Sequence, residues 1–198
     1  MAFFRLIPNL TIIAPKDFKE LEDMLEFAVN LGKPVVIRYP RGGESKKKFT
    51  SHSKMEYGKA EIIRNGTDIS IIAIGKTVDR AQKVAKMLEE EQISAEVINA
   101  RFLKPFDKDT IKDSIEKTKK VITLEDGTII NGLATVVKEL IVDEKMKNIE
   151  IYNYGYPDEF IKHGQVQELE QLYHQDEEYI YHEAKQILDK KRQNDETK

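Results

Sequence analysis

Apolar runs typical of β-strands alternate with amphipathic helical patterns along most of the chain, and this alternation limits the fold more than any other feature. The strand-like runs span residues 10–14, 34–38, 57–64, 68–74, 95–99, 121–124 and 149–152. Helical patterns separate most of them, at residues 17–32, 77–91, 107–118 and 132–142, and another helical region starts at residue 165. Strands that alternate with helices form a largely parallel sheet with helices on both faces.

Turn and capping residues support these boundaries. Asp17 and Glu20 have the spacing of a capping box, and Asp107 suits the start of a later helix. Asn65-Gly66 predicts a hairpin between the runs at 57–64 and 68–74, which adds an antiparallel edge to the sheet. We therefore predict an α/β fold, a three-layer α/β/α arrangement whose mostly parallel five-stranded sheet carries one antiparallel edge strand.

Composition excludes several classes of function. The chain has 198 residues, 34% of them charged, a net charge of -3 and no cysteine. An acidic net charge argues against general nucleic-acid binding, and the lack of cysteine excludes disulfides and thiolate metal sites. No apolar stretch is long enough to span a bilayer, and the first residues lack the apolar core of a signal peptide. We expect a cytoplasmic protein that binds neither nucleic acid nor membrane.

Two arginines close the second strand-like run, in the segment Val35-Val36-Ile37-Arg38-Tyr39-Pro40-Arg41-Gly42-Gly43. Guanidinium groups bind phosphate or carboxylate in a bidentate manner, and open α/β sheets bind ligands where strands pass into loops. Arg38 and Arg41 are therefore candidate anion-binding residues. The alternative is that they are solvated or paired with a nearby carboxylate.

Other candidate residues have weaker support. Glu125, in Glu125-Asp126-Gly127 at a strand end, is either a catalytic carboxylate or, as we favour, a helix cap or a partner of lysines. His163 is more typical of a structural role than of catalysis, although it is placed to contact a partner. The four histidines, His52, His163, His174 and His182, lack metal-binding spacing, and no nucleophile elbow or phosphate-binding glycine loop is present. We expect no metal site.

Five segments, in order, resemble one enzyme family. They are Ile7-Pro8-Asn9-Leu10 with Ala14-Pro15, Arg38-Tyr39-Pro40-Arg41-Gly42, Arg101-Phe102-Leu103-Lys104-Pro105-Phe106-Asp107, Glu125-Asp126-Gly127, and Gly155-Tyr156-Pro157-Asp158-Glu159-Phe160-Ile161-Lys162-His163-Gly164. From about residue 6 to residue 185 the chain resembles the C-terminal domain of the 1-deoxy-D-xylulose-5-phosphate synthases, whose fold is that of the transketolase C-terminal domain. The last segment is the most specific marker.

The resemblance implies part of a homodimeric transferase that condenses pyruvate with glyceraldehyde 3-phosphate, a step toward isoprenoids, thiamine and pyridoxal phosphate. Thiamine diphosphate and Mg²⁺ would be bound by the remaining domains of the same enzyme, and no cofactor or catalytic residue would belong to this chain. Arg41, with Arg38 beside it, would bind the acceptor phosphate. Tyr39, Glu125, Asp158 and His163 would face an interface or the active site. The chain would be inactive alone and would supply dimer contacts.

The resemblance also suggests domain limits. Residues 1–9 would end a linker from a missing pyrimidine-binding domain, residues 10–188 would form the transketolase C-terminal-like domain, and residues 189–198 would be a disordered charged tail. The apolar start, with Phe3, Phe4 and Leu6, either packs back on the domain or belonged to a larger body. Asn131-Gly132 stands where the family commonly has two glycines, and asparagine tolerates a positive φ.

Two alternatives remain. One is a stand-alone assembly module that pairs with a separately encoded transketolase-like half. The other is the second subunit of a 2-oxo-acid dehydrogenase, although the segment at residues 157–164 argues against it.

Overall fold

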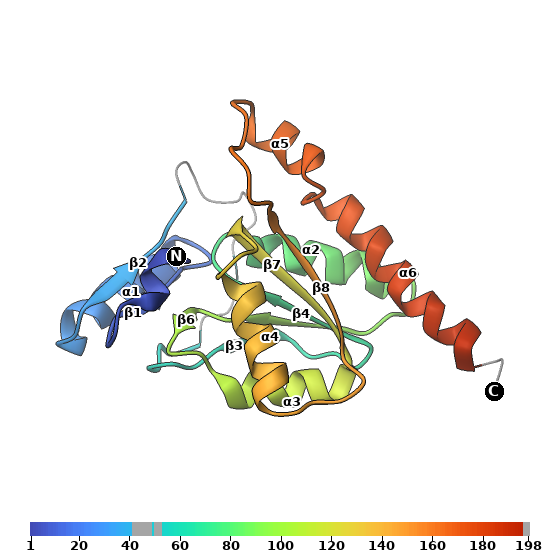
Figure 1. The fold of residues 1–198 in the computed structure, drawn as a ribbon, viewed down its shortest axis with the longest axis horizontal. Coiled ribbons are helices and arrows are strands. Elements are labelled where there is room, and N and C mark those ends of the chain that lie inside the picture. The colour runs from blue at the N-terminus through green and yellow to red at the C-terminus, as the bar shows by residue number, and fades with distance from the viewer. Residues whose placement is uncertain (41–48, 50–52, 196–198) are drawn as a thin grey trace.

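The structure, a computed structural model, describes residues 1–40, 49 and 53–195. Its main sheet has five strands in the order β3-β5-β4-β7-β8, and a second sheet has three in the order β2-β1-β6 (Figure 1). The main-sheet strands are β3 (Glu61–Arg64), β4 (Ile69–Ala73), β5 (Ala95–Asn99), β7 (Lys120–Thr128) and β8 (Glu150–Tyr156). The second sheet contains β1 (Thr11–Ile13), β2 (Val35–Ile37) and β6 (Phe102–Lys104).

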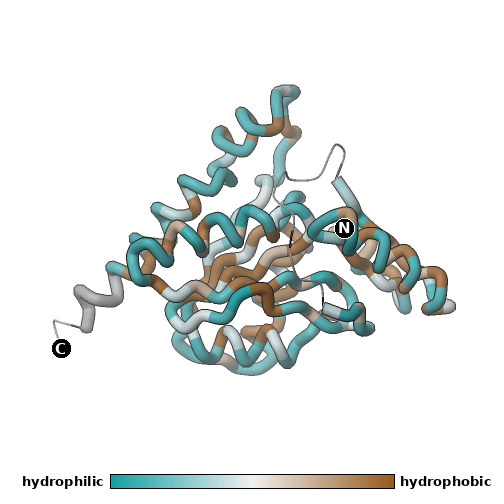
Figure 2. Tube along the Cα trace, turned by 180° about the vertical axis from the view of Figure 1, so that it is seen from behind, coloured by the Kyte–Doolittle hydropathy of each residue, from teal (hydrophilic) through white to brown (hydrophobic). Residues whose placement is uncertain are grey.

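Helices cover both faces of the main sheet, which makes three layers. The helices are α1 (Phe18–Leu31), α2 (Thr77–Glu90), α3 (Lys108–Thr118), α4 (Leu133–Asp143), α5 (Val166–Leu172) and α6 (Glu177–Asp195), and a 3-10 helix η1 (Phe3–Leu6) precedes them. Ile71 of β4 packs with α2 and α6, whereas its neighbour Ile72 packs with α3 and α4. Alternate residues of a strand point to opposite faces, so both faces of the apolar strand are buried. Figure 2 shows these apolar strands inside a more hydrophilic outer layer.

The antiparallel edge is present but has a different partner from the one we predicted. β3 pairs antiparallel with β5, while β4-β5, β4-β7 and β7-β8 are all parallel. The hairpin prediction was wrong because the turn after β3 crosses the start of β5. Thr67 and Asp68 both donate their N–H groups to the carbonyl oxygen of Ser94. A Cβ on Gly66 would lie 2.2 Å from the backbone of β5, so this crossing requires glycine.

The second sheet was also unexpected. β1 pairs parallel with β2 and antiparallel with β6, which lies outside the strand-like runs that we predicted from the sequence. α1 covers this sheet through Met24, which packs with Ile13 and Phe102. As predicted, Asp17 caps α1 by accepting the N–H of Glu20 at 2.7 Å. The β1–α1–β2 unit lies beside the main sheet (Figure 1).

The described residues near the two chain ends include contacts at the start and a long helix at the end. Near the start, Lys104 Nζ donates to the carbonyl oxygen of Ile7 at 2.7 Å, and Arg5 Nη1 donates to Asn131 Oδ1 at 2.9 Å. The start therefore packs back on the domain, although Phe3 stays 74% exposed. At the other end α6 continues to Asp195.

Candidate functional site

Arg38, the first of the two arginines that follow the second strand-like run, is fixed at the end of β2. The N–H of Arg38 donates to the carbonyl oxygen of Ile13 at 2.8 Å, which extends the pairing of β1 with β2. The guanidinium Nη2 of Arg38 donates to Asp126 Oδ2 at 2.8 Å and also to the backbone carbonyl oxygen of Asp126. Both side chains are partly buried. Arg38 therefore fits the alternative interpretation of the sequence, in which the arginine is paired with a nearby carboxylate.

Asp126 belongs to a chain of alternating charges, which we call the edge network: Arg38, Asp126, Lys76, Glu170 and Arg80. Lys76 Nζ lies 3.4 Å from Asp126 Oδ2 and 3.6 Å from Glu170 Oε1, and Arg80 Nη2 lies 2.5 Å from the same Glu170 atom. The network thus joins β2, β7, α2 and α5.

The edge network lies at the carboxyl end of the main sheet. The chain leaves β4 for β5 on one side and later enters β7 on the other side of β4. The β4–β7 border is therefore the topological switch point, the place where open α/β sheets commonly bind ligands.

The remaining loop candidates are only partly placed. Arg41 lies outside the described residues. Tyr39 is exposed, and Pro40 is the last described residue before that gap. The structure thus places Arg38 against a carboxylate, while the role of Arg41 stays a prediction.

Glu125 caps a helix. Its carboxylate accepts the N–H groups of Leu133 at 3.0 Å and Ala134 at 2.9 Å, at the start of α4. Burial raises the pKa of Glu125, although these two N–H groups and the charge of Arg38 oppose the shift. The geometry is that of the structural reading that we favoured from the sequence.

The turn beside Glu125 has the backbone that the sequence suggested. Asn131 has a φ of 59°, the left-handed conformation that asparagine tolerates. A Cβ on Gly132 would lie 1.9 Å from Glu125 Oε2, so the second residue of this turn must be glycine for the cap to form.

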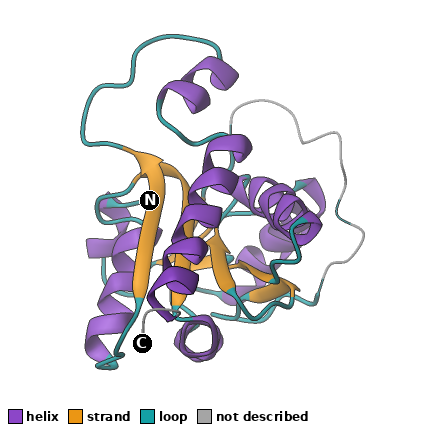
Figure 3. Cartoon of the chain, turned by 90° about the vertical axis from the view of Figure 1, so that its right-hand side faces the viewer, coloured by secondary structure: helices purple, strands orange, loops and turns teal. Residues whose placement is uncertain are grey.

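Asp158 and His163 are exposed in the loop between β8 and α5. In Figures 1 and 3 this loop and α5 extend beyond the end of the sheet. Phe160, in the same loop, is 103% exposed. These residues are therefore available for an interface but are not assembled with each other into a catalytic group. Within the described ranges, no three histidine, aspartate or glutamate side chains are placed to hold a metal ion.

Sequence reasoning missed a group that we call the buried ionic cluster: Lys16, Glu20, Glu61, Asn99 and Arg101. Lys16 Nζ lies 3.2 Å from Glu20 Oε1 and 2.6 Å from Glu61 Oε2. Arg101 binds the same two carboxylates, with 2.7 Å from Nε to Glu20 Oε1 and 3.1 Å from Nη2 to Glu61 Oε2. Asn99 Nδ2 donates to Glu20 Oε1 at 3.0 Å. All five residues are buried, so their charges compensate one another rather than being solvated.

The buried ionic cluster also fixes the point where the chain returns from the loop. Arg101 Nη2 donates to the carbonyl oxygen of Ser53 at 3.1 Å, and the N–H of Ser53 donates to Glu61 Oε1 at 2.9 Å. A signal existed in the sequence, because Arg101 lies two residues after the end of a buried strand.

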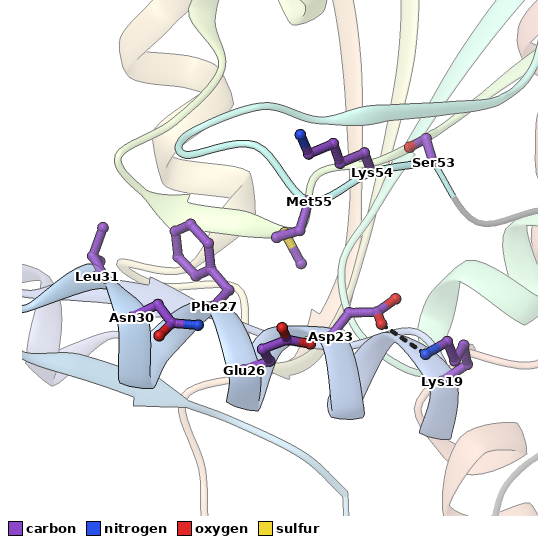
Figure 4. Close-up of a pocket in the computed structure, with 9 residues that line it drawn as sticks. All are labelled: Lys19, Asp23, Glu26, Phe27, Asn30, Leu31, Ser53, Lys54 and Met55. Carbon is purple, nitrogen blue, oxygen red and sulfur yellow. Dashed lines mark ion pairs between the residues drawn. The ribbon is translucent and has the colours of Figure 1, made fainter.

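A cavity of about 540 Å³ lies between α1 and Ser53–Met55 (Figure 4). Its lining combines apolar side chains, such as Phe27 and Met55, with an ion pair between Lys19 and Asp23 at 2.9 Å.

Two family profiles match the chain. The profile described as "Transketolase, C-terminal domain" matches residues 58–180, which is more than half of the sequence. The chain belongs to the transketolase C-terminal domain family. The profile described as "Transketolase, pyrimidine binding domain" matches residues 1–44. That second match includes β1, α1 and β2, whereas we expected only residues 1–9 to precede the C-terminal domain.

Two similar proteins of known sequence carry the same name. A 1-deoxy-D-xylulose-5-phosphate synthase of Halothermothrix orenii is 38% identical over 96% of this chain, and one of Clostridium tetani is 39% identical over 95%. The chain spans about 30% of the length of these relatives.

Two solved structures share the fold. A chain titled "Split gene transketolase, inactive beta4 tetramer" has a TM-score of 0.86 and 28% identity, and the match covers 94% of this chain and 60% of that one. A transketolase of Pichia stipitis has a TM-score of 0.70 at 19% identity, covers 94% of this chain and 26% of its own, and supports the fold alone.

The contacts described above join the two matched segments. In the buried ionic cluster, Lys16 and Glu20 lie in the pyrimidine-binding match, whereas Glu61 and Arg101 lie in the C-terminal match. The pair of Arg38 with Asp126 crosses between the same two segments. These ion pairs therefore set how the end of the pyrimidine-binding segment sits on the C-terminal domain.

Proposed function

We propose that the chain is the C-terminal part of a 1-deoxy-D-xylulose-5-phosphate synthase. The observation that carries the proposal is 38% identity over 96% of the chain to a protein of that name. In this reaction pyruvate loses its carboxylate as carbon dioxide. The remaining two-carbon unit forms a carbon–carbon bond to the aldehyde carbon of glyceraldehyde 3-phosphate, and the aldehyde oxygen takes up a proton. Thiamine diphosphate supplies the electron sink for the decarboxylation when it is bound.

We assign the cofactor and its Mg²⁺ to other domains of the enzyme. Across residues 1–40, 49 and 53–195, the acidic side chains near the edge network are already paired with Arg38, Lys76 and Arg80. They therefore do not form a free donor set for Mg²⁺, which prefers several oxygen ligands and water. The residues of this chain bind and orient a substrate rather than perform the bond changes.

The proposed contribution of this chain is the acceptor-phosphate contact of Arg41. Arg38 is engaged by Asp126, so it supports the loop, and Arg41 is the arginine that we assign to the phosphate. Tyr39, Asp158 and His163 are exposed and are proposed to face the rest of the enzyme.

The exposed apolar face of α1 supports the proposal that another domain covers it in the whole protein. Phe18, Leu25 and Val29 are 57%, 52% and 82% exposed, and β2 is an edge strand of the second sheet. Because residues 1–44 match a pyrimidine-binding domain, we propose that the remainder of that domain covers this face, within a cytoplasmic homodimeric enzyme.

A second candidate is a chain that pairs with a separately made half. The similarity to a chain of a split-gene transketolase favours it. Isolated chain should then be inactive, and activity should return on mixing with the missing domains. A full-length polypeptide detected in the source organism by an antibody to this chain would exclude this candidate.

Arg41→Ala tests the proposed function in the complete enzyme. Loss of a charge-assisted contact, roughly 1.5–3 kcal/mol, should raise the KM for glyceraldehyde 3-phosphate roughly ten- to a hundredfold and leave the KM for pyruvate nearly unchanged. Arg64→Ala, which removes a surface arginine paired with Glu89, is the matched control. Equal changes for the two substrates would refute the phosphate role of Arg41.

A further inference from the structure

The strand β8 forms the outer border of the main sheet. Across residues 1–40, 49 and 53–195, β8 pairs with β7 alone and ends the strand order of that sheet (Figure 1). Its residues 151–156 are all half-buried, whereas residues 120–125 of the adjacent β7 are all buried. An edge strand carries a row of backbone N–H and C=O groups that can pair with a strand of another molecule.

The hydrogen bonds to the β7 side show which backbone groups of β8 point away from the sheet. The N–H of Glu150 donates to the carbonyl oxygen of Lys119, just before β7. The carbonyl oxygen of Tyr156 accepts the N–H of Ile129, just after β7. In a parallel pair, every second residue of a strand directs both its backbone groups to the same neighbour. The residues between these positions therefore direct their N–H and C=O groups outward, and they are Ile151, Asn153 and Gly155.

The strand β8 lacks the features that protect the other edges. At the opposite edge of the main sheet, β3 has four residues, and its register with β5 shifts between Ile62 and Arg64. The edges of the second sheet, β2 and β6, have three residues each. In contrast, β8 has seven residues and contains neither lysine nor proline, the residues that commonly prevent pairing between edges. It is therefore the edge best suited to accept another strand.

We propose that β8 pairs antiparallel with β8 of a second copy of this chain, so that the main sheets of the two copies form one continuous sheet. This inference goes beyond the proposed function and does not require it. A two-fold axis at Asn153 would place Ile151 opposite Gly155 of the second copy and Asn153 opposite its counterpart. Each of these opposed pairs would exchange two backbone hydrogen bonds. Two-fold interfaces of this kind are the commonest in homo-oligomers.

The side chains of β8 are complementary to themselves in this register. On the α4 face, the branched side chain of Ile151 would lie beside Gly155, which has no side chain to crowd it. On the α6 face, Tyr152 would lie opposite Tyr154 of the second copy. Aromatic pairs across antiparallel strands stabilise a sheet. Both faces of the joined strands are therefore filled without overlap.

The charges of β8 also favour a second copy. Glu150 is the only charged residue of the strand, and it pairs with Lys120 at 2.8 Å. In the register centred on Asn153 it would lie opposite Tyr156 of the second copy, at the end of the paired region. Like charges directly opposite each other destabilise antiparallel strands. Along residues 150–156 no like charges meet in this arrangement.

The test is the association of the chain in analytical ultracentrifugation, with Asn153→Pro as the variant and Asn153→Ala as its matched control. Both substitutions remove the side-chain contact with Thr123, but only proline removes the outward N–H, which the pairing with β7 does not use. We expect the wild type and Asn153→Ala to dimerise. For Asn153→Pro the dissociation constant of the dimer should rise roughly ten- to a hundredfold, because the axis removes the hydrogen bond twice.

Amide exchange followed by NMR adds a measurement that needs no variant. The outward amides of Ile151, Asn153 and Gly155 should exchange slowly at concentrations where the chain is a dimer and faster on dilution. If circular dichroism shows that Asn153→Pro is unfolded, this dependence on concentration decides the question.

Several results would overturn the proposal. They are a wild-type chain that stays monomeric at about 1 mM, a folded Asn153→Pro chain that dimerises as well as Asn153→Ala, or slow exchange of the three amides in the monomer. Slow exchange that appears only when the other domains of the enzyme are added would also overturn it, and would assign the edge to those domains. The KM values that test Arg41 enter none of these results, so this proposal and the proposed function can fail separately.

Discussion

Glu20 offers the strongest test of the ionic contacts that join the two segments. Its carboxylate accepts from the N–H of Lys16 at 2.7 Å, from Arg101 Nε at 2.7 Å and from Asn99 Nδ2 at 3.0 Å, and the residue is 1% exposed. Glu20→Gln keeps the size of the side chain but removes one of two negative charges that face the Lys16 and Arg101 cations.

The expected cost follows from this charge balance. The cluster would keep two buried cations and one carboxylate, that of Glu61, so one positive charge would lose its compensation. Breaking a buried ion pair from one side costs about 3–5 kcal/mol. The amide nitrogen of glutamine also cannot accept a hydrogen bond. Because a domain has a free energy of unfolding of about 5–15 kcal/mol, this loss would be a large part of the total.

The assay is urea unfolding of the chain followed by far-ultraviolet circular dichroism, since the sequence contains no tryptophan. Glu22→Gln is the matched control on the same helix. Glu22 is 73% exposed and pairs with Lys19, so its loss should change stability little. Hydrogen exchange of residues 11–37 would show whether the β1–α1–β2 unit loosens first. If Glu20→Gln destabilised the chain no more than Glu22→Gln, the reasoning about the buried ionic cluster would be wrong.

Three further predictions concern acid stability and two glycines. Burial alone would raise the pKa of Glu61, but the ammonium, amide and guanidinium groups around it lower the pKa below its ordinary 4.5. The ionised Glu61 therefore contributes fully to the stability of the fold above pH 4.5, and this contribution is lost as the pH falls through the lowered pKa. Glu61→Gln should therefore flatten the dependence of the urea midpoint on pH between about pH 5 and pH 3. Gly66→Ala places a Cβ 2.2 Å from the backbone of β5 and should cost roughly 1–3 kcal/mol or more in urea unfolding. Gly132→Ala displaces the Glu125 carboxylate and should lower the free energy of unfolding by roughly 1–3 kcal/mol, because the contacts with the backbone N–H groups are lost. In the control Gly127→Ala the new Cβ meets no atom within 4 Å, so the free energy of unfolding should change by no more than about 0.5 kcal/mol. Either glycine variant behaving like Gly127→Ala would contradict the close approach assigned to it.

The sequence alone determined the local elements and the fold class. Strand and helix periodicity, the N-caps at Asp17 and Asp107 and the stop at Gly32 depend on residues within a few positions of one another. They predicted the order of the main-sheet strands and of the helices between them, the three layers and an antiparallel edge, whereas β6 was missed. The motifs at residues 38–42 and 155–164 likewise indicated the family that the comparisons support.

Only the tertiary structure decided which distant residues meet. It paired β3 with β5 instead of β4, and it placed β6 in a second sheet with β1. It also joined Arg38 to Asp126, which are 88 positions apart, and Glu20 to Arg101, which are 81 apart. About a third of the residues are charged, so a given arginine has many carboxylates as possible partners and no local pattern selects one. The selection comes from burial: packing of the β1–α1–β2 unit on the main sheet excludes water from a few charges, and those charges must then compensate one another.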